Sequence, residues 1–198
     1  MKTKLQCLVI CFAIVTTHLL HAQGYIVPNG VTYAGTSEGP GYSIDVIHDP
    51  INGYATGFSL VPLDANTFRF SFILDIGVRV FFVSPNNPIT ANTILSGTYT
   101  EPAAPSYVFS DGVPFYLGLY TGNMTYSPPS RIYDNPLFGW VELVNNQGVI
   151  EMLGGALEYQ GGGIYAGTQT IIPVPEPGAL ALVGLGGVLL GWRRWRTA

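Results

Sequence analysis

Residues 67–83 read TFRFSFILDIGVRVFFV, and apolar side chains recur in them at every second position. The residues of this shared parity are Phe68, Phe70, Phe72, Leu74, Val78, Val80 and Phe82. A period of two indicates β-strands with one face buried in a core. The run is too long for one ordinary strand, so we expect a hairpin of residues 67–74 and 78–83. A three-residue loop at 75–77 keeps the parity of the two arms and ends in Gly77, which tolerates a left-handed backbone.

The rest of the chain between its two ends has short strand patterns separated by turns. Strands are expected at residues 42–47, 54–61, 106–109, 115–120, 138–144, 149–153, 156–159 and 163–169. Gly, Pro, Asn, Asp and Ser gather in turns at residues 49–53, 84–88, 111–112, 127–130 and 145–148. Many short strands without a long amphipathic helix predict an all-β fold. We expect a single, jelly-roll-like β-sandwich ectodomain at residues 23–172.

Residues 1–22 have the pattern of a secretory signal peptide. Lys2 and Lys4 form a basic start, and an apolar run follows at residues 5–15. Ala22 is a small residue at the expected cleavage point. The apolar run of about 11 residues is too short for a bilayer, which needs about 20. We therefore expect removal of this leader and export of the residues that follow it.

The chain ends in a proline-bracketed glutamate, a short apolar run and an arginine cluster. As a helix, the apolar run at residues 178–192 would extend about 22 Å, less than a bilayer core of about 30 Å. Pro177 suits the first turn of such a helix. Arg193, Arg194 and Arg196 follow it, and arginines in this place stay on the cytoplasmic side of a membrane. We expect a short transmembrane helix with a stop-transfer cluster.

Residues 173–198 resemble a PEP-CTERM sorting signal, in which Pro175, Glu176 and Pro177 precede the apolar helix and the basic cluster. Such signals occur on exported proteins of Gram-negative bacteria that make extracellular polysaccharide. The resemblance implies handling by the secretion machinery and by an exosortase, a membrane-embedded enzyme similar to cysteine transpeptidases. That enzyme is expected to recognise the Pro-Glu-Pro segment and to cut near it. The resemblance therefore implies a cargo protein, anchored transiently in the inner membrane and then delivered to the cell surface or extracellular matrix.

The composition of residues 23–172 excludes several functions. Both cysteines, Cys7 and Cys11, lie in the leader, so the rest of the chain has neither a disulfide nor a thiol nucleophile. Both lysines also lie in the leader, and residues 23–172 keep three arginines against eleven acidic residues. Nucleic acids and anionic lipids need clustered Lys and Arg, so neither is expected as a partner.

Few residues are candidates for catalysis. His48, with Asp45 and Asp49 nearby, is the one candidate centre for Ser-His-Asp chemistry. A glycosidase needs two facing carboxyl groups. The candidates for such a pair are Glu142, Glu151 and Glu158. The alternative is that these are solvent-facing strand residues, and we expect no catalytic residue and no enzyme.

Two groups of oxygen-bearing side chains are candidates for a calcium site. One is Asp45, Asp49 and Asn52, and the other is Asp134 with Asn135. The same residues are typical turn formers, and their spacing does not match an EF-hand loop. Zinc prefers nitrogen and sulfur ligands, which one histidine and no cysteine cannot supply. We expect no metal and no cofactor.

Residues 107–140 are rich in aromatic side chains. The candidates for stacking on sugar rings are Tyr116, Tyr126, Tyr133 and Trp140. Clustered exposed aromatics are what a sugar-binding patch requires. The alternative is that Phe115, Leu117 and Leu119 alternate into a core, with the tyrosines at its rim.

A second resemblance concerns residues 138–143, 156–159 and 163–168, which look similar to the closing hairpins of β ectodomains that often precede this kind of tail. It supports a β fold and implies no activity. The functional expectation is a non-enzymatic structural or adhesive module of the cell surface or matrix. The alternatives are a carbohydrate-binding module for exopolysaccharide, which needs an exposed aromatic strip, and a secreted glycosidase, which needs two carboxyls in one cleft.

Overall fold

The computed structural model describes residues 24–36, 41–73, 77–127 and 130–174 of the 198-residue chain. Strands and one short helix, α2, make up the secondary structure of these residues. The bounds are β1 (Tyr25–Ile26), β2 (Val31–Thr36), β3 (Tyr42–Asp49), β4 (Tyr54–Pro62), β5 (Thr67–Ile73), β6 (Arg79–Val83), β7 (Pro88–Ile89), α2 (Ala91–Leu95), β8 (Tyr107–Val108), β9 (Pro114–Ser127), β10 (Ser130–Asn146), β11 (Val149–Tyr159), β12 (Gly163–Tyr165) and β13 (Ile171–Ile172). Residues Gln23–Pro173 form one compact unit.

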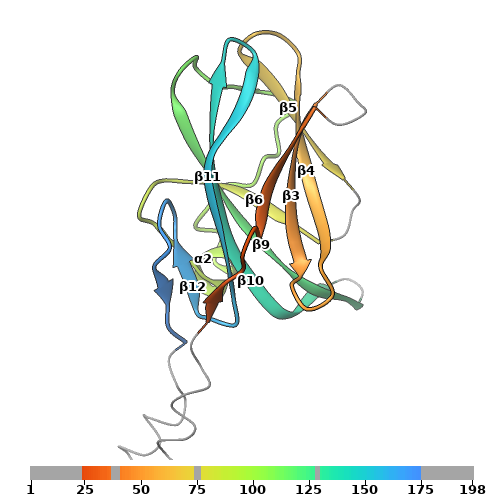
Figure 1. Cartoon of the computed structure of the whole chain (residues 1–198), viewed down its shortest axis with the longest axis vertical. Helices are drawn as coiled ribbons and strands as arrows, with labels where there is room; N and C mark the ends of the chain where they lie inside the picture. Colours follow the sequence, from red (N-terminus) through yellow and green to blue (C-terminus); the bar gives the residue numbers. More distant parts are fainter. Residues whose placement is uncertain (1–23, 37–40, 74–76, 128–129, 175–198) are drawn as a thin grey trace, which may run out of the picture. The chain divides into compact units, whose positions relative to one another are not determined.

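Three antiparallel sheets hold these strands (Figure 1). The β9–β11 sheet has the strand order β1-β11-β10-β9-β6, and the β3–β5 sheet has the order β2-β3-β4-β5-β8. A small sheet has the order β13-β12-β7. Figure 1 shows β3, β4 and β5 side by side on one side of the domain, with β9, β10 and β11 on the other. The expected all-β class is therefore confirmed, as several antiparallel sheets.

Most of the expected strands are present, and several are longer than their sequence patterns. The patterns at 149–153 and 156–159 belong to one strand, β11, whose register shifts opposite Glu142 and Leu143. Strands β1, β2, β7 and β13 and helix α2 have no counterpart among the expected elements. All of these except β2 are five residues or shorter, too short to produce a clear period.

The expected hairpin at residues 67–83 is wrong in its pairing. Strands β5 and β6 form close to the expected arms, but β5 pairs with β4 and β8, whereas β6 pairs with β9. The chain therefore passes from one five-stranded sheet to the other between these strands. The apolar side chains of the predicted parity still face one core, because Phe68 of β5 and Val80 of β6 enter it from opposite sheets.

The two five-stranded sheets share an apolar core, which we call the inner cluster. The β3–β5 sheet contributes Ile44, Phe58 and Leu60, and each of these side chains has no exposed surface. The β9–β11 sheet contributes Leu117 and Val141, which are equally buried. Full burial of one such side chain contributes about 1.5–3 kcal/mol, so this cluster is the main source of cohesion between the two sheets.

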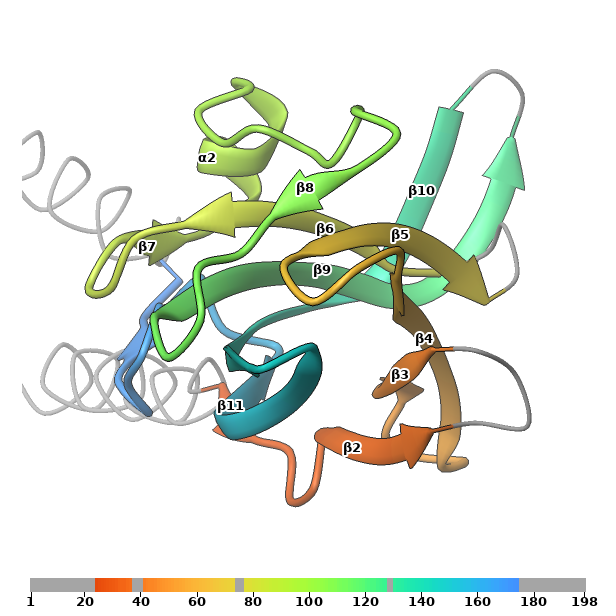
Figure 2. The ribbon, with the colours of Figure 1, turned by 90° about the horizontal axis from the view of Figure 1, so that it is seen from above.

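A second apolar core, the outer cluster, lies on the opposite face of the β9–β11 sheet. Its buried members are Phe81, Val83, Ile89, Ile94, Phe138, Trp140, Ala156, Ile164 and Ala166. Strand alternation explains the division, because Val141 enters the inner cluster while its neighbour Trp140 enters the outer one. Figure 2 shows α2 and β7 beside β6 at this face. Ile89 of β7, Ile94 of α2 and Ile164 of β12 cover it.

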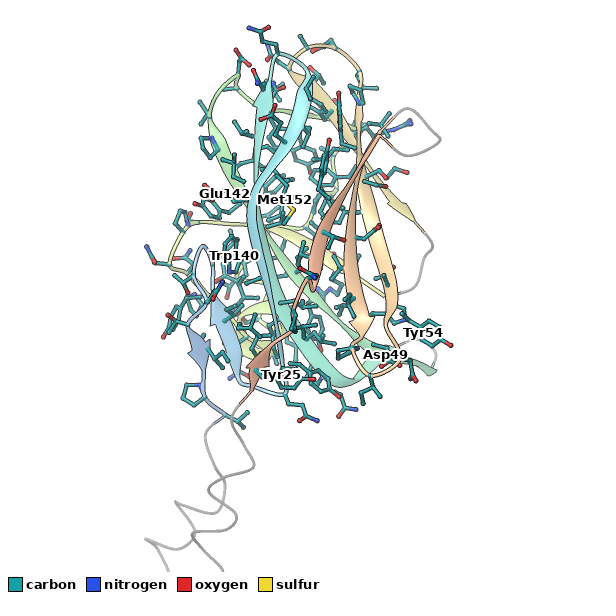
Figure 3. The ribbon with its side chains drawn as sticks, in the orientation of Figure 1. Tyr25, Asp49, Tyr54, Trp140, Glu142 and Met152 are labelled. Atoms are coloured by element: carbon teal, nitrogen blue, oxygen red, sulfur yellow. The ribbon has the colours of Figure 1, made fainter. Side chains whose placement is uncertain are left out.

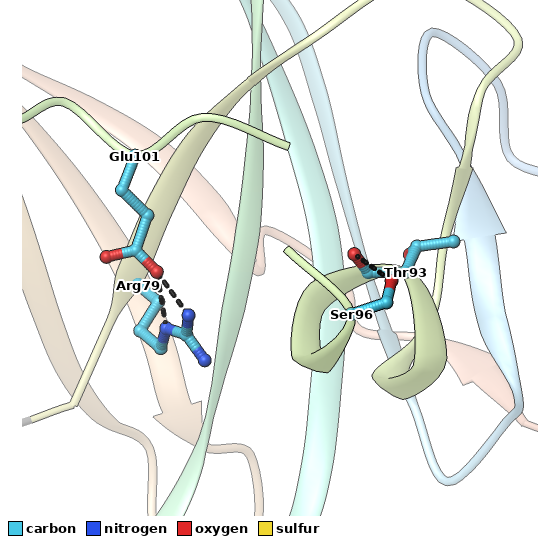
Figure 4. A network of polar contacts seen from close by, with 4 residues as sticks. All are labelled: Arg79, Thr93, Ser96 and Glu101. Carbon is cyan, nitrogen blue, oxygen red and sulfur yellow. Dashed lines mark hydrogen bonds and ion pairs between the residues drawn. The ribbon is translucent and has the colours of Figure 1, made fainter. Parts of the chain in front are cut away.

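Side-chain contacts fix the segment that contains α2 (Figure 4). Thr90 Oγ1 accepts a hydrogen bond from the Thr93 N–H, and Thr93 Oγ1 accepts one from the Thr90 N–H, which makes a capping box at the helix start. Ser96 Oγ donates to the Thr93 carbonyl at 3.3 Å. Farther along, Arg79 Nε donates to Glu101 Oε1 at 2.8 Å, and the Arg79 Nη2 also pairs with that oxygen. The connection from β7 to β8 is thus tied to β6.

The expected signal peptide at residues 1–22 and the expected transmembrane helix at 178–192 lie outside the described residues, so their extents stay predictions. In the part of the chain that the structure describes, no helix is long and apolar enough to cross a membrane.

Candidate functional site

Tyr116 and Glu142 form a polar pair at the edge of the outer cluster. They lie opposite each other in the β9–β10 ladder, so their side chains project from the same face of the sheet. The Tyr116 phenol donates a hydrogen bond of 2.7 Å to Glu142 Oε1. This bond to a carboxylate, together with partial burial and the negative charge of Glu142, raises the pKa of Tyr116 above its usual value. Both side chains are half-buried, so the pair remains accessible to a ligand.

Trp140 lies beside this pair but is closed to solvent. It is 7% exposed, and its indole Nε1–H donates a hydrogen bond of 2.6 Å to the Thr168 carbonyl. The ring centroids of Tyr116 and Trp140 are 6.2 Å apart, with their planes at 47°. The indole therefore packs in the outer cluster and anchors the turn that follows β12. Figure 3 shows Trp140 and Glu142 on the side of the domain that carries β12.

The structure thus brings two of the four predicted sugar-stacking residues together. Tyr116 is half-buried and Trp140 is nearly covered. Tyr126 and Tyr133 lie in the distal parts of β9 and β10, where Tyr126 pairs with Arg131. The side chains of Tyr126 and Tyr133 lie outside the described residues. The stacking role of all four stays a prediction.

Glu158 is separated from the other two candidate glycosidase carboxyls, whereas Glu151 is opposite Val144, two residues along β10 from Glu142. Glu142 and Glu158 share a face of the β9–β11 sheet, but Glu142 is opposite Gly154. Four residues along β11 separate Gly154 from Glu158, about 13 Å at the rise of a strand. Glu151 is exposed, and its Oε1 accepts a hydrogen bond of 3.3 Å from the Asn146 side chain. Glu158 has no exposed surface. A substrate could not reach Glu158 together with either of the others.

The segment around His48 builds a turn. Asp49 Oδ1 accepts hydrogen bonds from the backbone N–H groups of Ile51 and Asn52 at 3.0 and 3.1 Å, and Oδ2 accepts one of 2.7 Å from the Asn52 amide. These hydrogen bonds lower the pKa of Asp49, and the bond from the Asn52 side chain has the largest effect. The His48 ring stacks on Tyr54 with centroids 6.2 Å apart and an interplanar angle of 18°. Figure 3 shows Asp49 and Tyr54 on the side of the domain away from Trp140.

This arrangement uses the oxygens of the first predicted calcium group for the turn. Both Asp49 oxygens already accept hydrogen bonds from Asn52 or its neighbour, which is the pattern of an Asx turn. The Asp134 side chain lies outside the described residues. Among the residues that the structure describes, no three His, Cys, Asp or Glu side chains come close enough to hold a metal ion.

Two features of this face could not be read from the sequence. The segment that follows β12 covers Trp140, since the carbonyl of Thr168 accepts the indole hydrogen bond. Glu158 lies in the same face of β11 as Ala156 and has no hydrogen-bond partner for either oxygen among the described residues. Its only sequence signal is a parity shared with the buried Ala156.

The C-terminal segment has a specific match among protein families. A family model described as "PEP-CTERM protein-sorting motif" matches residues 173–196. The chain ends in a PEP-CTERM sorting motif. A protein with this motif is exported, processed by exosortase and sorted to the cell surface, so the expected family resemblance is confirmed. No curated protein and no solved structure matches the chain.

The PEP-CTERM motif begins directly after the last strand of the domain. Strand β13 ends at Ile172, and the Ile172 carbonyl accepts a hydrogen bond of 2.7 Å from the Gly162 N–H. Pro173 and Val174, the first two residues of the motif, are exposed. Pro175, Glu176, Pro177 and the arginine cluster lie outside the described residues, so their separate roles stay predictions. The hydrogen bonds of the domain thus extend to the residue before the motif.

Proposed function

We propose that residues 23–172 form a single β-sandwich module that acts without catalysis at the cell surface or in the extracellular matrix, as a structural or adhesive unit. The match of residues 173–196 to the PEP-CTERM motif carries this proposal, because it assigns the chain to exosortase as cargo. The shared inner cluster between two five-stranded sheets supports the sandwich.

The engagement of its polar side chains supports a non-enzymatic role. The Trp140 indole donates to Thr168, and the Asp49 carboxylate is saturated by its own turn. Of the three candidate glycosidase carboxyls, Glu158 is fully buried and lies about 13 Å along β11 from the position opposite Glu142, so these two cannot act as a pair. The Trp140 indole and the Asp49 carboxylate therefore stabilise the fold through these hydrogen bonds.

The sorting step assigns roles to two groups in the tail. The secretion machinery exports the chain behind its leader, and Arg193, Arg194 and Arg196 stop the tail at the cytoplasmic side of the inner membrane. Exosortase then recognises Pro175, Glu176 and Pro177 and cuts near them. The apolar run is short for a permanent anchor, which agrees with a tail that is removed after transient anchoring.

Carbohydrate binding is the second candidate, and the Tyr116–Glu142 pair favours it. A half-buried tyrosine whose phenol is oriented by a carboxylate presents part of its ring and a polar edge at the same place. That combination suits a sugar ring of an exopolysaccharide, which has an apolar face and hydroxyl groups at its edge. Trp140 would support this site from beneath and would not stack on the sugar.

Cell fractionation of the native host tests the proposed sorting. Glu176→Ala should leave the protein in the inner membrane, while the wild type reaches the surface fraction. Glu151→Ala is the matched control, because it removes an exposed carboxyl outside the motif and should not change sorting. Arrival of Glu176→Ala at the surface in wild-type amounts would contradict the proposal.

A pull-down with exopolysaccharide isolated from the same host tests the second candidate. Tyr116→Ala should abolish retention of the protein on the polysaccharide, and Tyr54→Ala should leave it unchanged. Tyr54 is a suitable control because it is 63% exposed and lies on the other side of the domain. Equal retention of both variants and the wild type would rule out a Tyr116 sugar site.

A further inference from the structure

Glu158 is the most isolated polar side chain in the described part of the chain. It has no exposed surface, and neither carboxylate oxygen has a hydrogen-bond partner among the described residues. Its neighbours across the ladder are Phe138 on one side and Ile26 on the other, so its surroundings are apolar. Burial strongly disfavours an ionised carboxylate that has no partner. The carboxyl therefore needs either a proton or a cationic partner at this position.

Two glycines bring the start of the domain against this carboxyl. A Cβ at Gly24 or at Gly161 would lie within 3.0 Å of Glu158 Oε1, closer than real Cβ atoms approach. The Gly161 N–H lies near the Glu158 carboxyl and partly offsets the effect of burial on its pKa. The geometry of this contact is not that of a hydrogen bond. The backbone of Gly24 is therefore in direct contact with the Glu158 carboxyl.

The three arginines of residues 23–172 have backbone positions in other parts of the fold. Arg79 is paired with Glu101, and Arg69 lies on β5 of the other five-stranded sheet. Arg131 belongs to the distal part of β10, where its backbone is opposite Tyr126. The other positively charged group that the mature chain supplies is its α-ammonium group.

Leader removal would create that ammonium group beside Glu158. A signal peptidase hydrolyses the Ala22–Gln23 peptide bond with one water molecule, which leaves a carboxylate on Ala22 and an α-ammonium group on Gln23. The Gln23 nitrogen is bonded within the residue that precedes Gly24, so it lies within about 5 Å of the Gly24 Cα. The new ammonium group is therefore tethered one residue away from Gly24, whose backbone contacts the carboxyl.

We propose that the α-ammonium group of Gln23, released by leader cleavage, binds the buried Glu158 carboxylate and completes the outer cluster. This inference rests on the leader cleavage in the proposed function. Before cleavage Glu158 has no charged partner among the described residues, and after cleavage it holds the new N-terminus through charge-assisted hydrogen bonds. Leader removal thereby tightens the fold of the exported domain. In the absence of such a partner, burial raises the pKa of Glu158 to about 8, close to that of an ordinary α-amino group.

The chain offers a selective way to test this pairing. Lys2 and Lys4 are the only lysines, so the α-amine is the single amino group of a chain that covers residues 23–198. Acetylation with an amine-directed reagent blocks it without modifying any other amine. A Gln23→Ala background keeps the α-amine and prevents cyclisation of the N-terminal glutamine.

A double-mutant cycle in this background measures the coupling. Urea unfolding at pH 7 is recorded for the free and acetylated chains, each with Glu158 and with Glu158→Gln. Acetylation should lower the folding equilibrium constant on the order of tenfold or more when Glu158 is present. In the Glu158→Gln pair it should change that constant less than about twofold. Equal effects in both pairs would overturn the inference.

Two further measurements keep the test decisive. If Glu158→Gln does not fold, NMR titration of the α-amine replaces the cycle, since a paired ammonium titrates above about 8 and a free one in the usual range of about 7.7–8.0. N-terminal sequencing of the exported protein separates the two possible failures. A start at Gln23 without coupling overturns this inference alone, whereas an uncut leader overturns the leader prediction in the proposed function.

Discussion

Tyr116 in β9 donates a hydrogen bond of 2.7 Å to Glu142 in β10, and the two residues are directly opposite each other in the ladder. The pair stands at the border between the covered outer cluster and solvent. The pKa of Tyr116 can therefore be measured by titration, and a ligand can reach the pair.

Glu142→Gln should lower the pKa of Tyr116 toward its usual value of about 10. The hydrogen bond to the carboxylate is the first cause of the raised pKa, and the substitution removes the charge but keeps an acceptor. Because the folded state favours the neutral phenol, the stability gained from this pair is present below about pH 10 and is lost as the pH rises beyond it. NMR titration of Tyr116 measures this, and an unchanged pKa in Glu142→Gln would contradict the assignment.

Gly118→Ala should destabilise the domain by about 1–3 kcal/mol. A Cβ at this position would lie within 3.0 Å of the Phe81 ring in the outer cluster, so either the ring or the strand must shift. Gly154→Ala is the matched control in the same sheet, because its Cβ would meet the nearest atoms of Trp140 at 3.6 Å, an ordinary contact. Urea unfolding of both variants measures the difference. Equal stabilities would mean that the outer cluster is more loosely packed than this structure has it.

Trp140→Phe should cost about 1–3 kcal/mol, because the Thr168 carbonyl loses its donor and the smaller ring leaves a gap. Tyr54→Phe, at an exposed aromatic position, should change stability by less than about 0.5 kcal/mol. Thermal unfolding followed by near-UV circular dichroism measures both. A stable Trp140→Phe variant that had lost polysaccharide binding would instead favour a direct ligand role for the indole.

Glu158 should make stability depend on pH when the α-amine is blocked. Its pKa is about 8 in the fold against an ordinary value of 4.5, so the unfolded chain releases this proton first as the pH rises. The stability that comes from the protonated carboxyl is therefore complete below about pH 4.5, declines between about 4.5 and 8, and then levels off. The loss should amount to roughly 3–5 kcal/mol relative to Glu158→Gln.

Unfolding of the two acetylated chains across this pH range measures the effect. The difference between them isolates Glu158 from the other titrating groups. A difference that stays constant with pH would contradict the burial of an ionisable group at this position.

Strands β5 and β6 were predictable because every second residue of 67–83 is apolar. The strands with which they pair were not predictable. A hairpin with a three-residue loop and a crossing between two facing sheets both bury that parity, since both place Phe68 and Val80 in the same core. The residues that distinguish the hairpin from the crossing are those of the other parity, at the odd-numbered positions. Phe81 and Val83 are buried in the outer cluster, so β6 is covered on both faces, which alternation in a single run does not reveal.

The candidate site was predictable only in part for a similar reason. Tyr116 and Trp140 fall in neighbouring expected strands with compatible parity, and the structure places their rings together. The covering of Trp140 by Thr168 and the isolation of Glu158 depend on short elements after β11, which have too few residues for a pattern. The sorting motif was predictable because it is a pattern of consecutive residues, which the sequence shows without any tertiary structure.

The intact mass of the protein recovered from its native host tests the central claim, export followed by cleavage at the sorting motif. The account predicts a wild-type chain that lacks residues 1–22 and everything beyond a cut near 175–177, and a Glu176→Ala chain that keeps its tail. A tail that is intact in both forms, with the protein held in the inner membrane, would contradict it.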